Sequence, residues 1–569
     1  MERGFQTHKI RKATELNGLW EFRAGEETRK VSVPSCWENY PGFENYEGKA
    51  VYEKKFRAGG NLHFLWKGVS HTGVVCLDGE KIAEHYNAFT PFETVVPDVK
   101  PGEHKLTIEV DNSFNEESAL HIPNDYFTYG GINRPVIVEE VRDCFIERLH
   151  IRPWKEGELW HGEITVRVRQ LKPLEGIKLR LLLGEEEVFC AEANAGCGVL
   201  SRVEAATDKK ENSGFGNAAG EEVYILKMDL IFPKVKAYEL EEPNLYYLTA
   251  QLIEGEEIVD DLIERIGFRE VRVRGKEILF NDKPIQIKGF NRHEDHAMYG
   301  CAIPYEAMDY DLRLIEDMGA NAVRTCHYPN DERFLDLCDE KGILVWEEGH
   351  ARGLSEEQMR HKNFRSQSLD CIREMIDNHY NHPCIFTWGI LNECASETEY
   401  GREIYIEQFD LIRSMDKSRP VTFASCKMEC DICLDLVDIV SMNIYPLWYH
   451  DSPAEEYVNK VYDWVQTTEG AGKPYIVSEI GAGGIPGYHA WGNPKWSEER
   501  QAEILEAQIR AVFAHKETSG LFIWQFCDCR ISAECFYGRP RTMNNKGVVD
   551  EYRRKKMAYD TVKRLFRDK

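Results

Sequence analysis

The sequence predicts a multidomain protein with two β-sandwich domains followed by a C-terminal (β/α)₈ barrel. The chain has 569 residues, which is far more than one hydrophobic core usually serves and corresponds to about three domains. Short strands separated by turn residues fill the first half of the chain. From about residue 276, short apolar strands alternate with amphipathic helical stretches. We place the domains at residues 1–142, 143–274 and 275–569.

The two β domains are predicted from apolar or alternating segments bounded by Gly, Asp and Asn. In the first domain these segments cover residues 16–22, 50–56, 62–68, 74–85, 104–113 and 135–141. In the second domain, for which a smaller immunoglobulin-like sandwich fits best, they cover residues 164–171, 177–184, 224–232 and 246–255. Residues 207–222 contain several Gly and Lys residues and are expected to form a mobile loop.

Eight strand–helix units in the last part of the chain favour a (β/α)₈ barrel. The expected strands cover residues 284–290, 321–326, 343–348, 384–391, 421–426, 439–445, 474–480 and 521–527. Helices are expected to begin after Asn330, Ser366 and Ser497, because each places an N-cap side chain ahead of acidic residues. A doubly wound sheet is the structural alternative, but it does not explain which residues follow the strands.

The charge and composition of the chain indicate which classes of binding partner are unfavourable. The formal net charge of −26 comes from 97 acidic and 71 basic residues. Such a polyanion repels nucleic acid and acidic membrane surfaces, although salt screens the repulsion beyond roughly 8 Å, so we expect neither as a partner. The start of the chain lacks the apolar segment of a secretory signal, no apolar run approaches the ~20 residues of a membrane span, and the 17 cysteines indicate reduced thiols. We therefore expect a cytoplasmic protein.

Polar side chains follow seven of the eight expected barrel strands, at the end where the chemistry of such barrels gathers. Glu393 closes the fourth strand in TWGILNE, and Glu479 closes the seventh in YIVSEIG. One such acid alone is usually a cap or an ordinary loop residue. Two carboxylates facing each other across the ring suit glycoside hydrolysis, in which one carboxyl donates a proton while the other attacks the anomeric carbon or activates water. Burial and a like-charged neighbour would raise the pKa of one of them.

Several segments, in this order along nearly the whole chain, resemble those of glycoside hydrolase family 2. LNGLWEF with VPSCWENY resembles the N-terminal sugar-binding-like jelly-roll domain of that family. IKGFNRHED and NAVRTCHYP resemble its first two barrel strands, and GILNE with IVSEIG resembles its catalytic segments. The resemblance implies a retaining mechanism with Glu393 as acid/base and Glu479 as nucleophile. It also implies carboxyl groups about 5–5.5 Å apart.

The choice of sugar rests on the segment after the last strand. Asn544-x-Lys546 resembles the pair that β-glucuronidases use on the C6 carboxylate of the sugar. A lysine and an amide form charge-assisted hydrogen bonds to a carboxylate, and a site built for them rejects a neutral sugar because its buried polar groups would stay unpaired. The basic run from Arg553 to Lys556 is interpreted instead as a solvated face at the start of the last helix.

The strand ends and the same resemblance supply the other expected substrate residues. Trp524 would form an apolar platform under the sugar ring, and Asn392 would donate a hydrogen bond to it. His293 and His327 lie at adjacent strand ends, which favours substrate contact over the structural role of a lone histidine. The best-known β-glucuronidases have an arginine a few residues before the Asn-x-Lys pair. It does not align uniquely to Arg539 or Arg541, and we assign Arg541. The full set is Asp125, His293, His327, Asn392, Asn443, Tyr445, Tyr449, Trp524, Arg541, Asn544 and Lys546.

The sequence also has competing interpretations. A β-galactosidase keeps the catalytic residues and fails only on Asn544-x-Lys546, whereas a β-galacturonidase keeps even that pair. Cys426, Cys430 and Cys433 have the C-x₃-C-x₂-C spacing of radical iron–sulfur enzymes, but that motif normally follows the first barrel strand and here it follows the fifth. A catalytically inactive sugar-binding protein would not need both carboxylates. The segment GAGGIPG does not match a dinucleotide fingerprint.

The sequence thus predicts a retaining β-glucuronidase that acts on small-molecule or oligosaccharide β-glucuronides. Only about a dozen residues separate WEEGHARG from SQSLDCIREM, where many bacterial relatives carry a long loop over the substrate. We therefore expect an open site whose preferred aglycone cannot be read from the sequence. No metal and no cofactor is expected; a surface flavin mononucleotide, as in some family members, is not testable from the residues. The resemblance implies a homo-oligomer, with a tetramer as the expected form.

Overall fold

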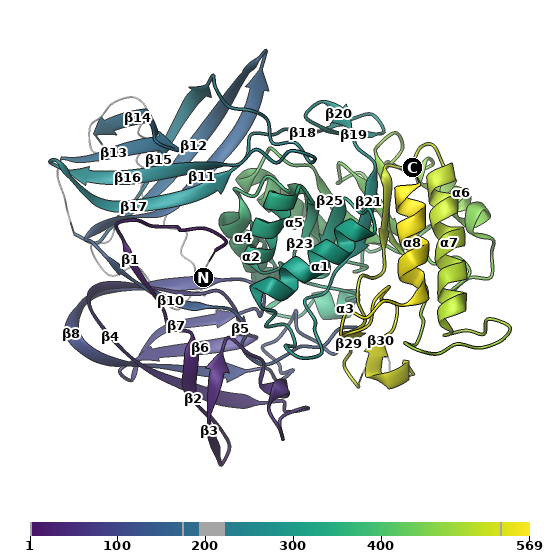
Figure 1. Ribbon diagram of the computed structural model, residues 1–569, viewed down its shortest axis with the longest axis horizontal. Coiled ribbons are helices and arrows are strands. Elements are labelled where there is room, and N and C mark those ends of the chain that lie inside the picture. The colour runs from purple at the N-terminus through teal and green to yellow at the C-terminus, as the bar shows by residue number, and fades with distance from the viewer. Residues whose placement is uncertain (1–2, 173–175, 193–221, 535–537, 569) are drawn as a thin grey trace.

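The computed structural model describes residues 3–172, 176–192, 222–534 and 538–568, and Figure 1 shows two β domains on one side of the molecule with the barrel on the other. Residues 207–221 of the expected mobile loop lie outside the described residues, and Glu222 begins a strand. The described helices include none that combines the length and the apolar character needed to cross a membrane. Two β-sandwich domains and a barrel confirm the predicted fold class; the boundaries after residues 142 and 274 stay predictions.

The first domain is built on an eight-stranded antiparallel sheet with the order β1-β10-β4-β8-β6-β7, in which β2 pairs with β3 and β4. The strands are β1 Lys12–Glu15, β2 Gly18–Ala24, β3 Glu27–Val33, β4 Lys49–Trp66, β6 Thr72–Leu77, β7 Glu80–Tyr86, β8 Phe92–Asp111 and β10 Val136–Val141. The expected segments 50–56 and 62–68 form one strand, because β4 pairs with β8 through the intervening glycines with shifts of register at Gly60.

The second domain packs a three-stranded sheet against a four-stranded sheet, with the orders β11-β12-β15 and β14-β13-β16-β17. These strands are β11 Cys144–Glu156, β12 Leu159–Gln170, β13 Ile177–Leu183, β14 Glu186–Glu192, β15 Glu222–Phe232, β16 Tyr246–Glu254 and β17 Glu257–Ile266. Four of the seven match the expected segments. Alternate residues of β12, such as Ile164, Val166 and Val168, are buried between the sheets, as the alternating sequence requires.

The third domain is a closed barrel of eight parallel strands in sequence order, and every expected strand is present. The strands are β21 Ile287–Asn291, β22 Ala322–Thr325, β23 Leu344–Glu348, β24 Ile385–Ile390, β25 Val421–Ser425, β26 Val440–Asn443, β27 Tyr475–Ile480 and β28 Gly520–Ile523. The helices are α1 Tyr305–Asp317, α2 Glu332–Lys341, α3 Glu356–Met359, α4 Phe364–His379, α5 Glu399–Met415, α6 Ala454–Val465, α7 Glu498–Ala514 and α8 Met557–Arg567.

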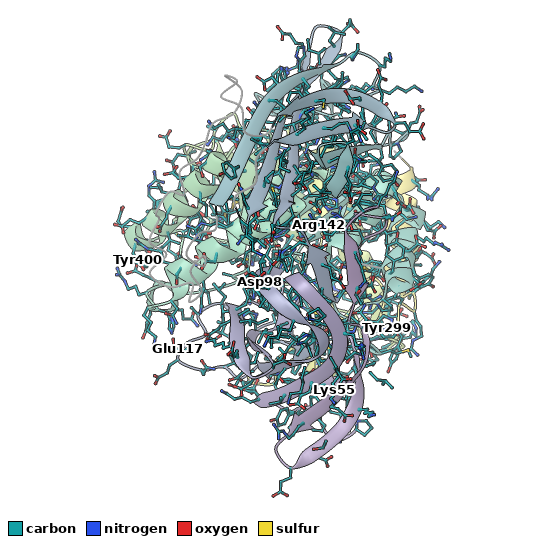
Figure 2. All side chains as sticks on the ribbon, turned by 90° about the vertical axis from the view of Figure 1, so that its left-hand side faces the viewer. Lys55, Asp98, Glu117, Arg142, Tyr299 and Tyr400 are labelled. Atoms are coloured by element: carbon teal, nitrogen blue, oxygen red, sulfur yellow. The ribbon has the colours of Figure 1, made fainter. Side chains whose placement is uncertain are left out.

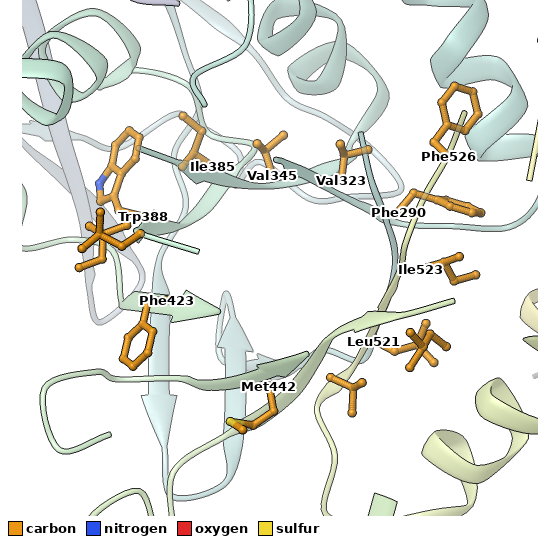
Figure 3. Packing of buried hydrophobic residues seen from close by; sticks show 14 of the residues in the cluster. Phe290, Val323, Val345, Ile385, Trp388, Phe423, Met442, Leu521, Ile523 and Phe526 are labelled. Atoms are coloured by element: carbon orange, nitrogen blue, oxygen red, sulfur yellow. The ribbon is translucent and has the colours of Figure 1, made fainter. Parts of the chain in front are cut away.

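Alternation along the barrel strands divides their side chains between two cores. Outward-facing residues such as Val323, Val345 and Leu521 lie around the ring of strands and pack under the helices (Figure 3). Inward-facing residues such as Leu344 and Phe522 form a separate cluster. That cluster also contains residues from the small sheet of β18 Val271–Arg274, β19 Glu277–Phe280 and β20 Lys283–Pro284, which therefore closes the end of the barrel opposite the carboxyl ends of the strands.

Two of the three expected helix starts are corrected. The Ser497 side chain accepts the N–H of Arg500, which confirms it as the cap of α7. The cap of α2 is Asp331 rather than Asn330, because the amide oxygen of Asn330 already accepts a hydrogen bond from Arg292 at 2.9 Å. Helix α4 begins at Phe364, so Ser366 lies inside its first turn and does not cap it.

The basic run before α8 is also corrected, since it is only partly solvated. Arg553 is 4% exposed and its Nε donates to Asp311 at 2.7 Å. Lys556 is 3% exposed and donates to Asp528 at 2.7 Å. Arg554 and Lys555 remain exposed. The run thus contains two buried ion pairs that its composition alone does not distinguish from a surface patch.

The start of the chain lies at the junction of the domains (Figure 1). Arg3 bonds to Glu332 at 2.6 Å and to Asp336 at 2.8 Å, both on α2, and lies 3.5 Å from Glu264 on β17. The two β domains meet through the buried Arg11, which bonds to Glu139 and to Asp260 at 2.8 Å each. Exposed pairs in the region of Asp98 and Arg142 (Figure 2), such as Lys172–Asp98 at 2.8 Å, add to this junction. The buried Arg3 cluster is therefore one electrostatic link between the second domain and the barrel, and Arg148 and Arg167 form another with Asp377 on α4.

We predict that Arg3→Met lowers the free energy of unfolding by about 3 kcal/mol, because removing one member of a buried ion pair leaves the carboxylates of Glu332 and Asp336 short of a cation. The measurement is the melting temperature by calorimetry at constant pH. Lys12→Met is the control, since Lys12 pairs with Glu140 at the surface and is 66% exposed, and its loss should cost less than about 1 kcal/mol. Equal shifts for both variants would contradict the role of Arg3.

Candidate active site

Glu393 and Glu479 lie at the carboxyl end of the barrel, at the ends of strands four and seven of the ring. Glu393 is the third residue after β24, and Glu479 is the penultimate residue of β27. Glu479 is 4% exposed and the Glu393 side chain 18%. Asn443, at the end of β26, joins the two strands: its amide nitrogen donates to Glu393 at 3.0 Å and its oxygen accepts from Ser478 at 2.7 Å. The two acids therefore lie in one polar site at this end of the barrel.

Both oxygens of Glu479 accept strong hydrogen bonds. Arg324 donates to Oε1 at 2.9 Å, and the Tyr445 hydroxyl donates to Oε2 at 2.6 Å. Burial and the nearby charge of Glu393 raise the pKa of Glu479 to about 7, whereas Arg324 and Tyr445 act in the opposite direction. Two donors on opposite oxygens favour the ionised form, so of the pair Glu479 is the better place for a negative charge.

Glu393 has fewer and weaker partners. Its Oε1 accepts from Asn443, and Arg352 lies 3.6 Å from its Oε2. Its backbone has φ of 53°, in the left-handed region that non-glycine residues seldom adopt. Such a conformation costs of order 1–3 kcal/mol and is typical of functional sites. Fewer donors therefore stabilise a negative charge on Glu393 than on Glu479.

Arg324, on β22, is the centre of the hydrogen-bond network and was not predicted. It is fully buried and bonds to both oxygens of Glu348 at 2.8 and 2.9 Å, and to Asn291 and Asn392 at 2.9 Å each. It therefore orients Asn392 as well as Glu479. Its signal in the sequence is a single charge inside the apolar segment NAVRTC, which does not reveal where the side chain points.

An aromatic wall lies beside this network. Trp524 is 3% exposed; the His327 ring stacks on it at 5.0 Å, and the His293 ring meets it edge-on at 5.3 Å. The Nδ1 atoms of these histidines bond to Glu348 at 3.0 Å and to Tyr328 at 3.1 Å, respectively. Burial and nearby arginines lower the pKa of His293 to about 3 and that of His327 well below its ordinary value. Both imidazoles are therefore neutral at working pH.

A second cluster surrounds Lys546 and includes one residue from the first domain. Asp125 Oδ2 accepts from Arg539 at 2.5 Å and from Asn544 at 3.1 Å. Lys546 is 2% exposed and donates to the Tyr449 hydroxyl at 2.9 Å. Burial lowers the pKa of Lys546, and the charge of Arg539 lowers it further. Among the residues that the structure describes, no carboxylate lies within 4.0 Å of the Lys546 ammonium group.

Arg541 and its alternative Arg539 have different partners, and the assignment of Arg541 stays a prediction. The Arg541 guanidinium bonds to Glu551 and lies 3.4 Å from Asn545 Oδ1, and its side chain is 38% exposed. Arg539, the alternative, instead contacts Asp125. Arg541 and Thr542 both have positive φ, so the chain turns at Arg541 in a way that residue spacing does not reveal.

Several buried polar atoms of the expected substrate residues have no hydrogen-bond partner among the described residues. They are Asp125 Oδ1, His293 Nε2, His327 Nε2, Asn392 Nδ2 and Asn544 Oδ1. Buried polar atoms are nearly always paired, and each one left without a partner costs about 1–3 kcal/mol. Five such atoms among residues of two adjoining clusters are typical of a site that completes its hydrogen bonds with a polyhydroxylated ligand.

The cysteine motif does not form a cluster site. Cys433 is buried and donates to the Ser396 carbonyl oxygen at 3.3 Å, whereas Cys426 and Cys430 are exposed. The group of three potential metal ligands found among the described residues lies elsewhere, at Asp339, His382 and Cys384. The radical-enzyme alternative therefore has no support from the arrangement of its three thiols.

Comparison with known proteins agrees with this geometry. Residues 271–568 match the model of the family described as "Glycosyl hydrolases family 2, TIM barrel domain". Over 91% of each chain, this protein is 27% identical to a β-glucuronidase of Streptococcus agalactiae. It is also 26% identical to a β-glucuronidase of Paenibacillus borealis, over 96% of each chain.

Solved structures resemble the whole chain. A family 2 β-galacturonidase from Eisenbergiella tayi bound to galacturonate is 48% identical, with a TM-score of 0.93 over 100% of this chain and 99% of that one. A β-D-glucuronidase of Dictyoglomus thermophilum is 24% identical with a TM-score of 0.84, over 100% of this chain and 99% of that one, which supports the fold alone. The family match covers more than half of the chain, and the paired carboxylates lie within it. The chain belongs to glycosyl hydrolase family 2 and is a glycosidase.

Proposed function

We propose that the protein is a retaining exo-acting β-hexuronidase whose preferred substrate is a terminal β-D-galacturonide. The main support for a uronide substrate is the environment of Lys546. Its ammonium group is buried, and its described hydrogen-bond partner is a neutral tyrosine hydroxyl. Burying a cation is costly unless a charge compensates it. The C6 carboxylate of a hexuronide would supply that charge.

The charges around Lys546 support a monoanionic ligand. Lys546 and Arg539 contribute two positive charges, and Asp125 contributes one negative charge, so the cluster carries a net charge of +1. Asn544 adds an amide donor beside them. A carboxylate that accepts from a lysine and an amide would neutralise the cluster, whereas the hydroxymethyl group of a neutral hexose would leave it charged.

Galacturonate is favoured over glucuronate by the relative at 48% identity, whose structure contains galacturonate. This changes the preference for glucuronide drawn from the sequence, which rested on the Asn-x-Lys pair and on the segments around Asn443 and Asp125. The two sugars differ only in the configuration of the C4 hydroxyl, so that pair serves both. Glucuronide is the second candidate, because the relatives at 26–27% identity are β-glucuronidases.

Glu479 would attack the anomeric carbon while Glu393 protonates the glycosidic oxygen, giving a glycosyl-enzyme ester and a free alcohol. Glu393 would then take a proton from water as the water oxygen attacks the same carbon and the Glu479 carboxylate leaves. The hydrogen bonds from Arg324 and Tyr445 to Glu479 support its role as an anionic nucleophile. The tetrameric state, the cytoplasmic location and the absence of a metal and of any cofactor stay predictions.

We predict that Lys546→Met lowers kcat/KM for nitrophenyl β-galacturonide about 10²-fold, since a hydrogen bond to a charged group contributes about 1.5–3 kcal/mol. Matched galacturonide, glucuronide and galactoside substrates measure the preference for the carboxylate, which should shift toward the galactoside in the variant. Lys495→Met is the control, because Lys495 is exposed and lies over the neighbouring Trp448 ring at 4.5 Å. A wild-type enzyme that prefers the galactoside, with no effect of Lys546→Met, would contradict the proposal.

The raised pKa of Glu479 also predicts a pH dependence. The nucleophile must be ionised to attack, so kcat/KM should rise as pH rises through about 7. Glu393→Gln removes the negative neighbour that raises the pKa of Glu479, so this pKa should fall. With an activated dinitrophenyl uronide, which needs no acid, the variant should keep activity, and its rise in kcat/KM should move to lower pH. A rise that stays at the wild-type pH in Glu393→Gln would show that another group titrates.

A further inference from the structure

We propose that Lys556, paired with Asp528, is a positioning residue for recognition of the substrate carboxylate. This inference rests on the proposed function. The segment of residues 544–547, which we name the carboxylate loop, carries Asn544 and Lys546 and has little regular structure beyond the two residues of β30 Met543–Asn544. Such a segment needs tertiary contacts to hold a buried ammonium group in place, and Lys556 supplies them from the residue before α8.

All three N–H groups of the Lys556 ammonium are used, each by a different part of the site. The Nζ atom donates to Asp528 Oδ1 at 2.7 Å, to the carbonyl oxygen of Gly484 at 2.7 Å and to that of Asn545 at 3.3 Å. Asp528 follows β28, Gly484 follows the strand that ends beside Glu479, and Asn545 belongs to the carboxylate loop. One buried cation therefore ties this loop to two strand ends of the barrel.

Asp528 completes the attachment from the other side. It is fully buried, and the oxygen that binds Lys556 also accepts the backbone N–H of Gly547 at 2.9 Å. The backbone approaches closely at this point: a Cβ atom on Gly547 would lie 2.2 Å from the Asp528 nitrogen. Glycine is therefore required there, and the ion pair fixes the backbone on both sides of Lys546.

Two backbone hydrogen bonds also hold the carboxylate loop in place. The N–H of Gly484 donates to the Asn545 carbonyl oxygen at 2.9 Å, so that oxygen is shared with Lys556. The N–H of Gln525 donates to the Lys546 carbonyl oxygen at 3.1 Å. Loss of Lys556 would leave the Asp528 carboxylate buried without a cation, so the adjoining backbone would have to rearrange to compensate it.

Hydrogen bonds weaken steeply with distance and angle, so a small shift of the carboxylate loop would weaken binding of the C6 carboxylate while the two acids stay in place. Lys556→Met should therefore raise KM for nitrophenyl β-galacturonide and the inhibition constant of free galacturonate at least tenfold, with kcat changed less than about threefold. Asp528→Asn should act in the same direction. The double variant removes the whole ion pair, and it should keep the KM effect with a smaller loss of stability than Lys556→Met.

Arg553→Met is the matched control, because Arg553 forms a buried ion pair three residues away with Asp311 on α1. It should lower the melting temperature and leave KM unchanged. Combination with Lys546→Met provides a second test: if Lys556 acts through Lys546, adding Lys556→Met to that variant should cause little further loss of kcat/KM.

Three results would overturn the inference: an unchanged KM in the soluble Lys556 and Asp528 variants, equal changes of KM and kcat, or full additivity with Lys546→Met. If Lys556→Met is insoluble, Asp528→Asn and the double variant decide by the same criteria. Failure of the proposed function is distinguishable from these outcomes, because Lys546→Met itself would then leave the preference for uronide unchanged.

Discussion

The uncompensated charge of the buried Lys546 ammonium is the constraint on which the rest of the site depends. A protein interior tolerates a cation when hydrogen bonds and an opposite charge offset its loss of hydration. The Tyr449 hydroxyl accepts one hydrogen bond from Lys546. A further buried ion pair, between Lys556 and Asp528, holds the adjoining backbone. Burial of the Lys546 charge costs free energy when no ligand is bound, and a ligand carboxylate would offset that cost.

Three domains contribute unequally to this arrangement. The barrel supplies both acids, Arg324, the histidines and Trp524, whereas the first domain adds Asp125, which contacts both Arg539 and Asn544. With the proposed function, recognition of the sugar carboxylate therefore depends on contact between domains. The second domain takes no part in the described site contacts, and it is linked to the barrel through the buried Arg3 cluster.

Much of the fold and the chemistry could be predicted from the sequence, because the signals were local. Apolar runs that end in polar residues locate all eight barrel strands and both acids, and the Asn-x-Lys pair locates the second cluster. Arg324 could not be found, since a charge within a strand does not show which network it joins. The different partners of Arg539 and Arg541 could not be predicted, because the backbone turns at Arg541 and Thr542. Lys556 was misjudged because burial of a basic residue depends on Asp528 and Gly484, which are distant in sequence.

The measurement that tests the central claim most directly is the crystal structure of the Glu479→Gln variant with an aryl β-galacturonide bound. We expect one carboxylate oxygen of the sugar to lie within about 3 Å of Lys546 Nζ and the Asn544 amide to contact the same group. The glycosidic oxygen should then lie beside Glu393. A sugar bound with its carboxylate away from Lys546, or with a water-filled gap around that ammonium, would contradict the account.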